Sequence, residues 1–120
     1  MANDVIIWHN PRCAKSREAL KLLQEKGIEP KIYKYLDEHP SEEEIRSLLK
    51  MLGVGPREIM RTKEKLYKEL NLKAVDDDEK LIEAMVEHPK LIERPIVIHN
   101  GKAVLGRPPQ KVIEWMETQR

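Results

Sequence analysis

The sequence lacks most of the residues that would indicate a disulfide-bonded, metal-binding or membrane protein. Its 120 residues include one cysteine, which excludes an intramolecular disulfide and a cysteine-rich zinc site. Its 22 Lys and Arg side chains barely exceed its 21 Asp and Glu, which argues against binding to nucleic acid or a membrane surface. No apolar run approaches the roughly 18 residues of a membrane span, and the N-terminus lacks the apolar segment of a signal peptide. These absences predict a cytoplasmic protein that binds no metal.

The apolar residues that are present predict an α/β fold. Short apolar runs that end at turn residues predict strands, and apolar residues three or four apart predict helices. The predicted strands are residues 5–8, 31–36, 96–99 and 102–105. A helix at 14–26 separates the first two strands, so a right-handed crossover makes them parallel. Asn100-Gly101 is typical of a tight hairpin between the last two strands. With a final helix after Pro109, this order predicts a thioredoxin-like, mixed four-stranded sheet.

The middle of the chain is predicted to be helical. Ser41 and Glu44 form the pattern of a capping box, and apolar residues at helical spacing follow them. Further along, the acidic residues 76–78 suit the positive end of another helix. We therefore expect a helical insertion at about 41–90, between the second and third strands of a single domain that spans residues 1–120.

Cys13 lies where the first predicted strand gives way to the first predicted helix. Backbone N–H groups at a helix start favour a thiolate over a thiol. His9 is four residues upstream, and Ser16 is three residues downstream, where its hydroxyl can point back at the sulfur. The same turn carries three basic residues: Arg12, Lys15 and Arg17. The alternative is a buried cysteine that acts only as a small apolar side chain, but the basic surroundings favour a reactive thiolate.

Two familiar cysteine motifs do not fit this turn. A CxxC oxidoreductase needs a second cysteine at position 16, which is Ser16 here. A phosphatase loop of the Cys-x5-Arg type needs an arginine at position 19, which is Ala19 here. A nucleophilic Cys13 therefore cannot resolve its own disulfide and needs an external thiol.

Three arginines stand out because of their neighbours. Arg61 lies at a break between predicted helices, Arg94 precedes Pro95, and Arg107 follows a glycine and precedes two prolines. A restricted backbone can fix the aim of a guanidinium, which suits bidentate binding of an oxyanion. Taken singly, each arginine fits a surface ion pair better than an oxyanion site. An X-Pro bond is cis in only about 5–6% of cases, so the base rate predicts a trans bond at Pro95.

Four segments of the sequence, in order, resemble the signatures of the glutaredoxin-coupled arsenate reductases. The first reads His-Asn-Pro-Arg-Cys-Ala-Lys-Ser-Arg, and the third and fourth contain Glu-Arg-Pro-Ile-Val and Gly-Arg-Pro. The matching segments are residues 9–17, 60–64, 88–97 and 106–108. The resemblance runs from about Val5 to Met116, nearly the whole chain, and the fold of that family is thioredoxin-like with a helical insertion.

The resemblance implies a role for each matched residue. It implies that Cys13 attacks the arsenic of arsenate, that His9 supports the thiolate, and that Ser16 hydrogen-bonds the sulfur. It also implies a cis bond at Pro95, against the base rate. The oxyanion-binding residues that it implies are Arg61, Arg94 and Arg107.

The resemblance therefore implies an arsenate reductase that uses glutathione as co-substrate and glutaredoxin as electron donor, with no tightly bound cofactor. Related short proteins on the same scaffold include glutathione-linked thiol reductases of other substrates and non-catalytic regulators that bind RNA polymerase. The regulators often use a CxxC switch, which Ser16 excludes. Some members of the family extend beyond the last helix, whereas this chain stops at Arg120, which leaves the substrate open beyond an arsenate-type oxyanion.

Overall fold

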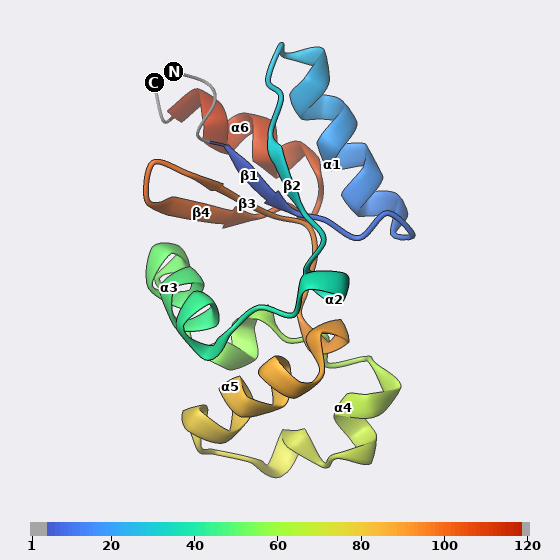
Figure 1. Ribbon diagram of the computed structural model, residues 1–120, viewed down its shortest axis with the longest axis vertical. Coiled ribbons are helices and arrows are strands. Elements are labelled where there is room, and N and C mark those ends of the chain that lie inside the picture. Colours follow the sequence, from blue (N-terminus) through green and yellow to red (C-terminus); the bar gives the residue numbers. More distant parts are fainter. Residues whose placement is uncertain (1–4, 119–120) are drawn as a thin grey trace. The chain divides into compact units, whose positions relative to one another are not determined.

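The computed structural model describes residues 5–118, which form two compact units (Figure 1). The sheet unit contains the described residues of 1–38 and 94–120, and the helical unit is His39–Glu93. The helical unit thus spans the insertion expected at 41–90. Among the described residues, no helix is long and apolar enough to cross a membrane.

The sheet unit is built on four short strands in the order β2-β1-β3-β4. The strands are β1 (Ile6–Trp8), β2 (Lys31–Tyr33), β3 (Ile96–His99) and β4 (Lys102–Leu105). β1 pairs parallel with β2 and antiparallel with β3, and β3 pairs antiparallel with β4. The turn between β3 and β4 places Asn100 at φ 52° and Gly101 at φ 73°, as a primed hairpin turn requires. The mixed four-stranded, thioredoxin-like sheet predicted from the sequence is confirmed.

One face of the sheet holds the core of this unit. Ile7 pairs with Val97, and Val97 pairs with Val104, so the three side chains project from the same face. α1 (Ala14–Glu25) and α6 (Gln110–Thr118) add apolar side chains to this cluster, among them Leu23 and Val112, which are fully buried. Because α1 shares this core with the sheet, the start of α1 is held against the end of β1, where Cys13 lies.

The second predicted strand, residues 31–36, is too long. β2 ends at residue 33, and α2 (Tyr35–Glu38) follows at once. The carbonyl of Lys34 accepts the first two amide hydrogen bonds of this helical turn, which ends the extended conformation. The ring of Tyr35 is fully buried and stacks on that of Trp8, with centroids 6.0 Å apart. Burial of an aromatic ring therefore outweighs the strand preference of this segment.

The helical unit contains α3 (Glu42–Leu52), α4 (Lys65–Glu69) and α5 (Asp78–Glu87). Three 3₁₀ turns connect or follow them: η2 (Pro56–Ile59), η3 (Leu72–Ala74) and η4 (Pro89–Leu91). The capping box of α3 is confirmed, since Ser41 and Glu44 exchange side-chain to backbone hydrogen bonds of 3.1 Å. α5 packs against α3, η2 and η4, so α5 is the central element of this unit.

Candidate active site

Cys13 is the N-cap residue of α1 and is partly exposed. The turn before it is held by Asn10, whose carbonyl accepts the N–H of Cys13 at 3.0 Å and whose Oδ1 accepts the N–H of Arg12 at 3.0 Å. The side chain of Arg17 reaches back to the same turn and donates to the carbonyl of Pro11 at 2.9 Å. The turn therefore presents the sulfur to the unpaired N–H groups at the start of the helix.

The surroundings of Cys13 favour its thiolate. Burial alone raises the pKa of the Cys13 thiol. Hydrogen bonds to the sulfur from the Ser16 amide, the Arg94 guanidinium and the Lys15 amide, together with the charge of Arg94, lower it further than burial raises it. The pKa of Cys13 consequently lies below its ordinary value, and the nucleophilic form is enriched near neutral pH.

Ser16 contacts the sulfur through its backbone amide, while its hydroxyl is occupied elsewhere. The residue is fully buried. Its Oγ accepts the N–H of Asn10 at 3.0 Å and lies 2.6 Å from Nδ1 of His9. The resemblance implies a hydrogen bond from Ser16 to the sulfur, and the structure supplies one from the amide, since the helix start points this N–H at Cys13.

His9 lies behind Ser16 as an uncharged ring. Burial lowers the pKa of His9 below its ordinary value of 6.5, and the nearby charges of Lys34 and Arg17 lower it further. A neutral imidazole adds no positive charge beside the thiolate, so His9 acts through Ser16. The Ser16 hydroxyl has a single hydrogen. If Nδ1 of His9 carries a hydrogen, it donates to Oγ; if Nδ1 is bare, it accepts the hydroxyl hydrogen.

Arg94 is the arginine of the sheet unit that lies beside Cys13. It precedes β3, and its bond to Pro95 is cis; the base-rate expectation of a trans bond is wrong here. Its guanidinium donates to the Cys13 sulfur. Its Nε is buried and has no hydrogen-bond partner within residues 5–118. An unsatisfied buried donor next to a nucleophilic sulfur is suited to an anionic oxygen, because such donors are rarely left unpaired.

Arg107 is fixed to the same segment as Arg94. Its Nη1 donates to the carbonyl of Arg94 at 3.3 Å, and the N–H of Gly106 donates to the carbonyl of Pro95 at 2.8 Å. A Cβ on Gly106 would lie 2.8 Å from Cγ2 of Val112 and 3.0 Å from Cγ of Pro95, so only glycine allows this approach. The residues before β3 and after β4 are thereby locked together.

Arg61 belongs to the helical unit and is already paired there. Its Nη1 lies 2.9 Å from a carboxylate oxygen of Glu64, and its Nε lies 3.7 Å from one of Glu93. Its N–H donates to the carbonyl of Leu91 at 2.7 Å. This is the ion-paired alternative that the sequence left open for each arginine, and the part of Arg61 in oxyanion binding stays a prediction.

Sequence reasoning missed one important residue of this site, Asn10. It is buried and makes three hydrogen bonds that shape the turn, whereas in the sequence it stands out only as one residue of the motif at 9–17. An Asn before proline, two residues ahead of an amide that its side chain can accept, was the available signal. Within the described residues, no group of three or more His, Cys, Asp or Glu side chains could hold a metal ion.

The arrangement supplies a sulfur nucleophile, hydrogen-bond donors on it, and a guanidinium with a spare donor beside it. A thiolate next to an anion-binding arginine can attack the central atom of an oxyanion, because the guanidinium offsets the repulsion between the two anions. Cys13, Ser16, His9 and Arg94 are brought together by contacts within the sheet unit, and Arg107 joins them through the backbone of Arg94.

Known proteins resemble this chain in sequence and in fold. The model of the ArsC family matches residues 8–115. An arsenate reductase from Haemophilus influenzae is 53% identical over 112 residues, 92% of this chain and 97% of that protein. An uncharacterized protein, YfgD, from Escherichia coli is 55% identical over 116 residues, 95% of this chain and 98% of that protein. A solved arsenate reductase from Vibrio cholerae superposes with a TM-score of 0.89 at 55% identity, covering 92% of this chain and 95% of that chain. The family match spans most of the chain and includes the Cys13 turn, Arg94 and Arg107, and the chain belongs to the ArsC family.

Proposed function

We propose that this protein reduces arsenate to arsenite in the cytoplasm, with Cys13 as the nucleophile. The observation that carries the proposal is the contact between the Arg94 guanidinium and the Cys13 sulfur at the start of α1, where the pKa of the thiol is lowered. The names of the relatives from Haemophilus influenzae and Vibrio cholerae support arsenate as the substrate.

In the first step the Cys13 thiolate attacks the As(V) centre. A sulfur–arsenic bond forms and an arsenic–oxygen bond breaks, and the departing oxygen leaves as hydroxide or water. Arg94 and Arg107 hold the remaining oxygens, and we propose Arg61 as the third cation. Several cations are needed, because two unit charges of like sign about 4 Å apart repel by around 4 kcal/mol at an effective dielectric constant of 20.

In the second step an external thiol provides the other sulfur, since the chain has one cysteine. The glutathione thiolate attacks the Cys13 sulfur, a disulfide forms and the sulfur–arsenic bond breaks. The electron pair of that bond stays on arsenic, which is reduced from As(V) to As(III) and leaves as arsenite. A thiolate of glutaredoxin then removes the glutathione from the disulfide and releases the Cys13 thiolate. Each cycle therefore consumes reducing equivalents delivered by glutathione and glutaredoxin.

A coupled assay tests both parts of this proposal. The purified chain is mixed with arsenate, glutathione, glutaredoxin and an NADPH-dependent glutathione reductase, and arsenite and NADPH are measured. We expect arsenite only when both glutathione and glutaredoxin are present. Full activity with thioredoxin alone would contradict the proposed electron source, and no arsenite in the complete mixture would contradict the function itself.

Thiol titration separates an enzyme from a non-catalytic regulator that binds RNA polymerase. A regulator without a thiol switch has no need of a lowered Cys13 pKa. We expect the rate of Cys13 alkylation by iodoacetamide to rise with pH along a curve whose midpoint lies below that of the same reaction in the urea-unfolded chain. Coincident midpoints would favour the regulator.

A further inference from the structure

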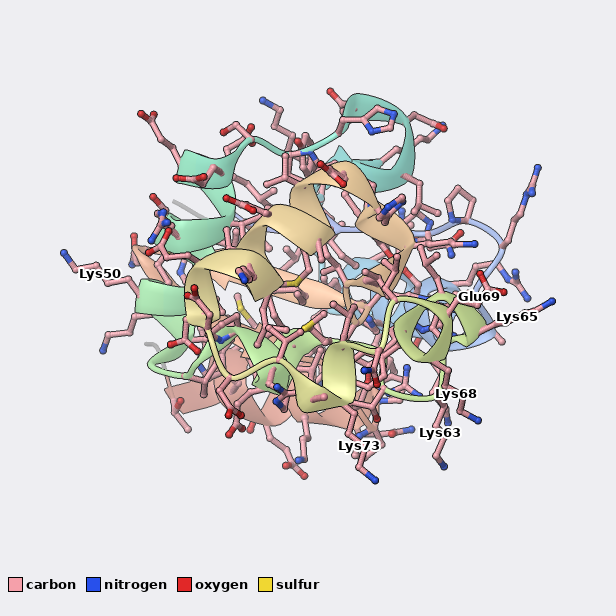
Figure 2. All side chains as sticks on the ribbon, turned by 90° about the horizontal axis from the view of Figure 1, so that it is seen from below. Lys50, Lys63, Lys65, Lys68, Glu69 and Lys73 are labelled. Carbon is pink, nitrogen blue, oxygen red and sulfur yellow. The ribbon has the colours of Figure 1, made fainter. Side chains whose placement is uncertain are left out.

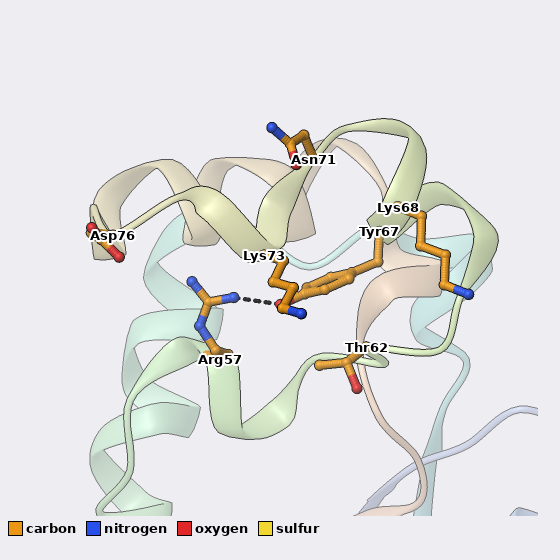
Figure 3. A pocket seen from close by; sticks show the side chains of 7 residues that line it. All are labelled: Arg57, Thr62, Tyr67, Lys68, Asn71, Lys73 and Asp76. Atoms are coloured by element: carbon orange, nitrogen blue, oxygen red, sulfur yellow. Dashed lines mark hydrogen bonds between the residues drawn. The ribbon is translucent and has the colours of Figure 1, made fainter.

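The helical unit contains a cavity that the chemistry of Cys13 does not use. Its volume is about 680 Å³, and all of its lining comes from residues between η2 and the start of α5 (Figure 3). The lining residues are Arg57, Thr62, Tyr67, Lys68, Asn71, Lys73 and Asp76. Every one of them carries a polar group, and polar groups in a pocket fix the orientation of a ligand.

Arg57 is a fixed cation in this cavity. Its guanidinium donates to the hydroxyl of Tyr67, to the carbonyl of Leu72 at 3.1 Å and to the carbonyl of Val75. These acceptors are neutral, and no carboxylate within residues 5–118 forms an ion pair with Arg57. A guanidinium has more N–H donors than these three bonds use. Arg57 therefore keeps an uncompensated positive charge and a spare donor in a rigid position.

Two lysines add mobile cations at the rim. Lys68 and Lys73 are exposed, and neither forms an ion pair with any described residue. Figure 2 shows both on one edge of the helical unit, whereas Lys50 extends from the opposite edge. The carboxylate of the neighbouring Glu69 pairs with Lys65, at 3.8 Å. The lining thus has three cations and one carboxylate, Asp76, which lies at the other end of the cavity from Lys68 (Figure 3).

The volume of the cavity favours an organic anion over an inorganic one. An inorganic oxyanion would fill a small part of about 680 Å³, whereas sites for small organic molecules measure roughly 300–1,000 Å³. Thr62 and Asn71 can supply neutral hydrogen bonds to such a molecule. We propose that this cavity binds a small organic dianion, a dicarboxylate or a phosphate ester, whose acidic oxygens are held by Arg57, Lys68 and Lys73. This proposal is independent of arsenate reduction.

Calorimetric titration of the full chain tests the site. The probes are glutarate, glucose 6-phosphate and, as the inorganic comparison, sulfate. We expect one of the two organic dianions to bind at a single site and sulfate to bind at least tenfold more weakly. The organic probe that binds tells a carboxylate site from a phosphate-ester site. No binding by either organic probe, or equal binding of sulfate, would overturn the proposal.

Lysine variants locate the binding within the molecule. Lys68→Gln and Lys73→Gln remove exposed charges without disturbing the bonds of Arg57, so both variants should fold. Each is expected to weaken the organic dianion about tenfold, which corresponds to about 1.4 kcal/mol. Lys50→Gln removes the same charge from the far edge and should leave affinity unchanged. If Lys50→Gln weakens binding as much as the other two, the effect comes from the net charge of the protein and not from this cavity, and the site is refuted.

Discussion

Arg94 of the sheet unit and Arg61 of the helical unit share the same sequence-based prediction, yet the structure gives them different surroundings. Arg94 donates to the Cys13 sulfur and keeps a buried Nε without a partner within residues 5–118. Arg61 forms ion pairs with Glu64 and Glu93. A neighbouring carboxylate competes with any anionic substrate for the same guanidinium, whereas a neighbouring thiolate requires the guanidinium for its own stability.

The comparison shows that local backbone restriction does not decide which partners the side chain of an arginine has. Both residues adjoin breaks in regular structure, and only their side-chain partners differ. A guanidinium keeps its positive charge for another anion when no carboxylate pairs with it, as for Arg94, whose Nε has no partner within residues 5–118, and for Arg57, whose three acceptors are neutral. Four experiments test the two units, in order of decreasing expected effect.

Replacing the proposed nucleophile should abolish arsenate reduction. Cys13→Ser keeps nearly the same shape, but a serine hydroxyl stays protonated near neutral pH, so arsenite production should fall to the uncatalysed background. Circular dichroism and the thermal midpoint should match those of the unaltered protein, because the residue is partly exposed at a helix N-cap that serine also favours. Measurable catalysed arsenite formation by this variant would refute Cys13 as nucleophile.

Exchanging each arginine for lysine tests the contrast directly. Arg94→Lys keeps the charge but loses the planar donor set, so kcat/KM for arsenate should fall roughly tenfold to a hundredfold. The pKa of Cys13, measured from iodoacetamide rates against pH, should rise because the guanidinium hydrogen bond is lost. Arg61→Lys should weaken arsenate binding by a smaller factor and leave the pKa of Cys13 unchanged. Equal shifts of that pKa in the two variants would contradict the distinction.

A methyl group between the two ends of the β3–β4 hairpin should destabilise the sheet unit. Gly106→Ala places a Cβ 2.8 Å from Val112 and 3.0 Å from Pro95, and such overpacking typically costs about 1–3 kcal/mol. Urea denaturation measures the loss in the free energy of unfolding. Gly55→Ala is the matched control, since a Cβ there meets nothing within 4 Å. A Gly106→Ala protein as stable as this control would show that the close approach is not required.

The smallest expected effect is the pH dependence that His9 contributes. Because the pKa of His9 is lowered from 6.5 in the folded chain, the unfolded chain binds more protons just below that pH. The free energy of unfolding therefore falls as the pH drops through about 6.5. Well above that pH, His9 is neutral in both states and adds no pH dependence. Comparing urea midpoints at pH 7.5 and 5.5, we expect a smaller drop for His9→Gln than for the unaltered protein. An identical drop would show that His9 titrates normally.

Local patterns were sufficient to predict the hairpin of the sheet unit, the start of α3 in the helical unit and the place of Cys13. The hairpin at Asn100 and Gly101, the capping box at Ser41 and the cysteine at a helix start each depend on a few neighbouring residues. Their conformations follow from turn chemistry and capping, which the sequence shows directly.

Features that depend on distant partners could not be predicted in this way. Residues 31–36 have the composition of a strand, but burial of Tyr35 against Trp8 turns the chain into α2. The hydroxyl of Ser16 is drawn to His9, seven residues away, and Arg61 is paired with Glu93, far along the chain. The spacing of residues in the sequence shows which side chains could interact, but tertiary packing determines which of them do.

The hydrogen bond from the Gly106 amide to the Pro95 carbonyl has a dynamic consequence. Arg94 and Arg107 flank one hairpin, and this bond and the one from Arg107 to the Arg94 carbonyl hold its two ends together. A local opening of these ends would release both guanidinium groups at once, so occupancy of the proposed oxyanion site follows a single opening equilibrium. The rate at which the Gly106 amide exchanges its hydrogen with solvent therefore reports the population of the open state, in which Arg94 and Arg107 are released together.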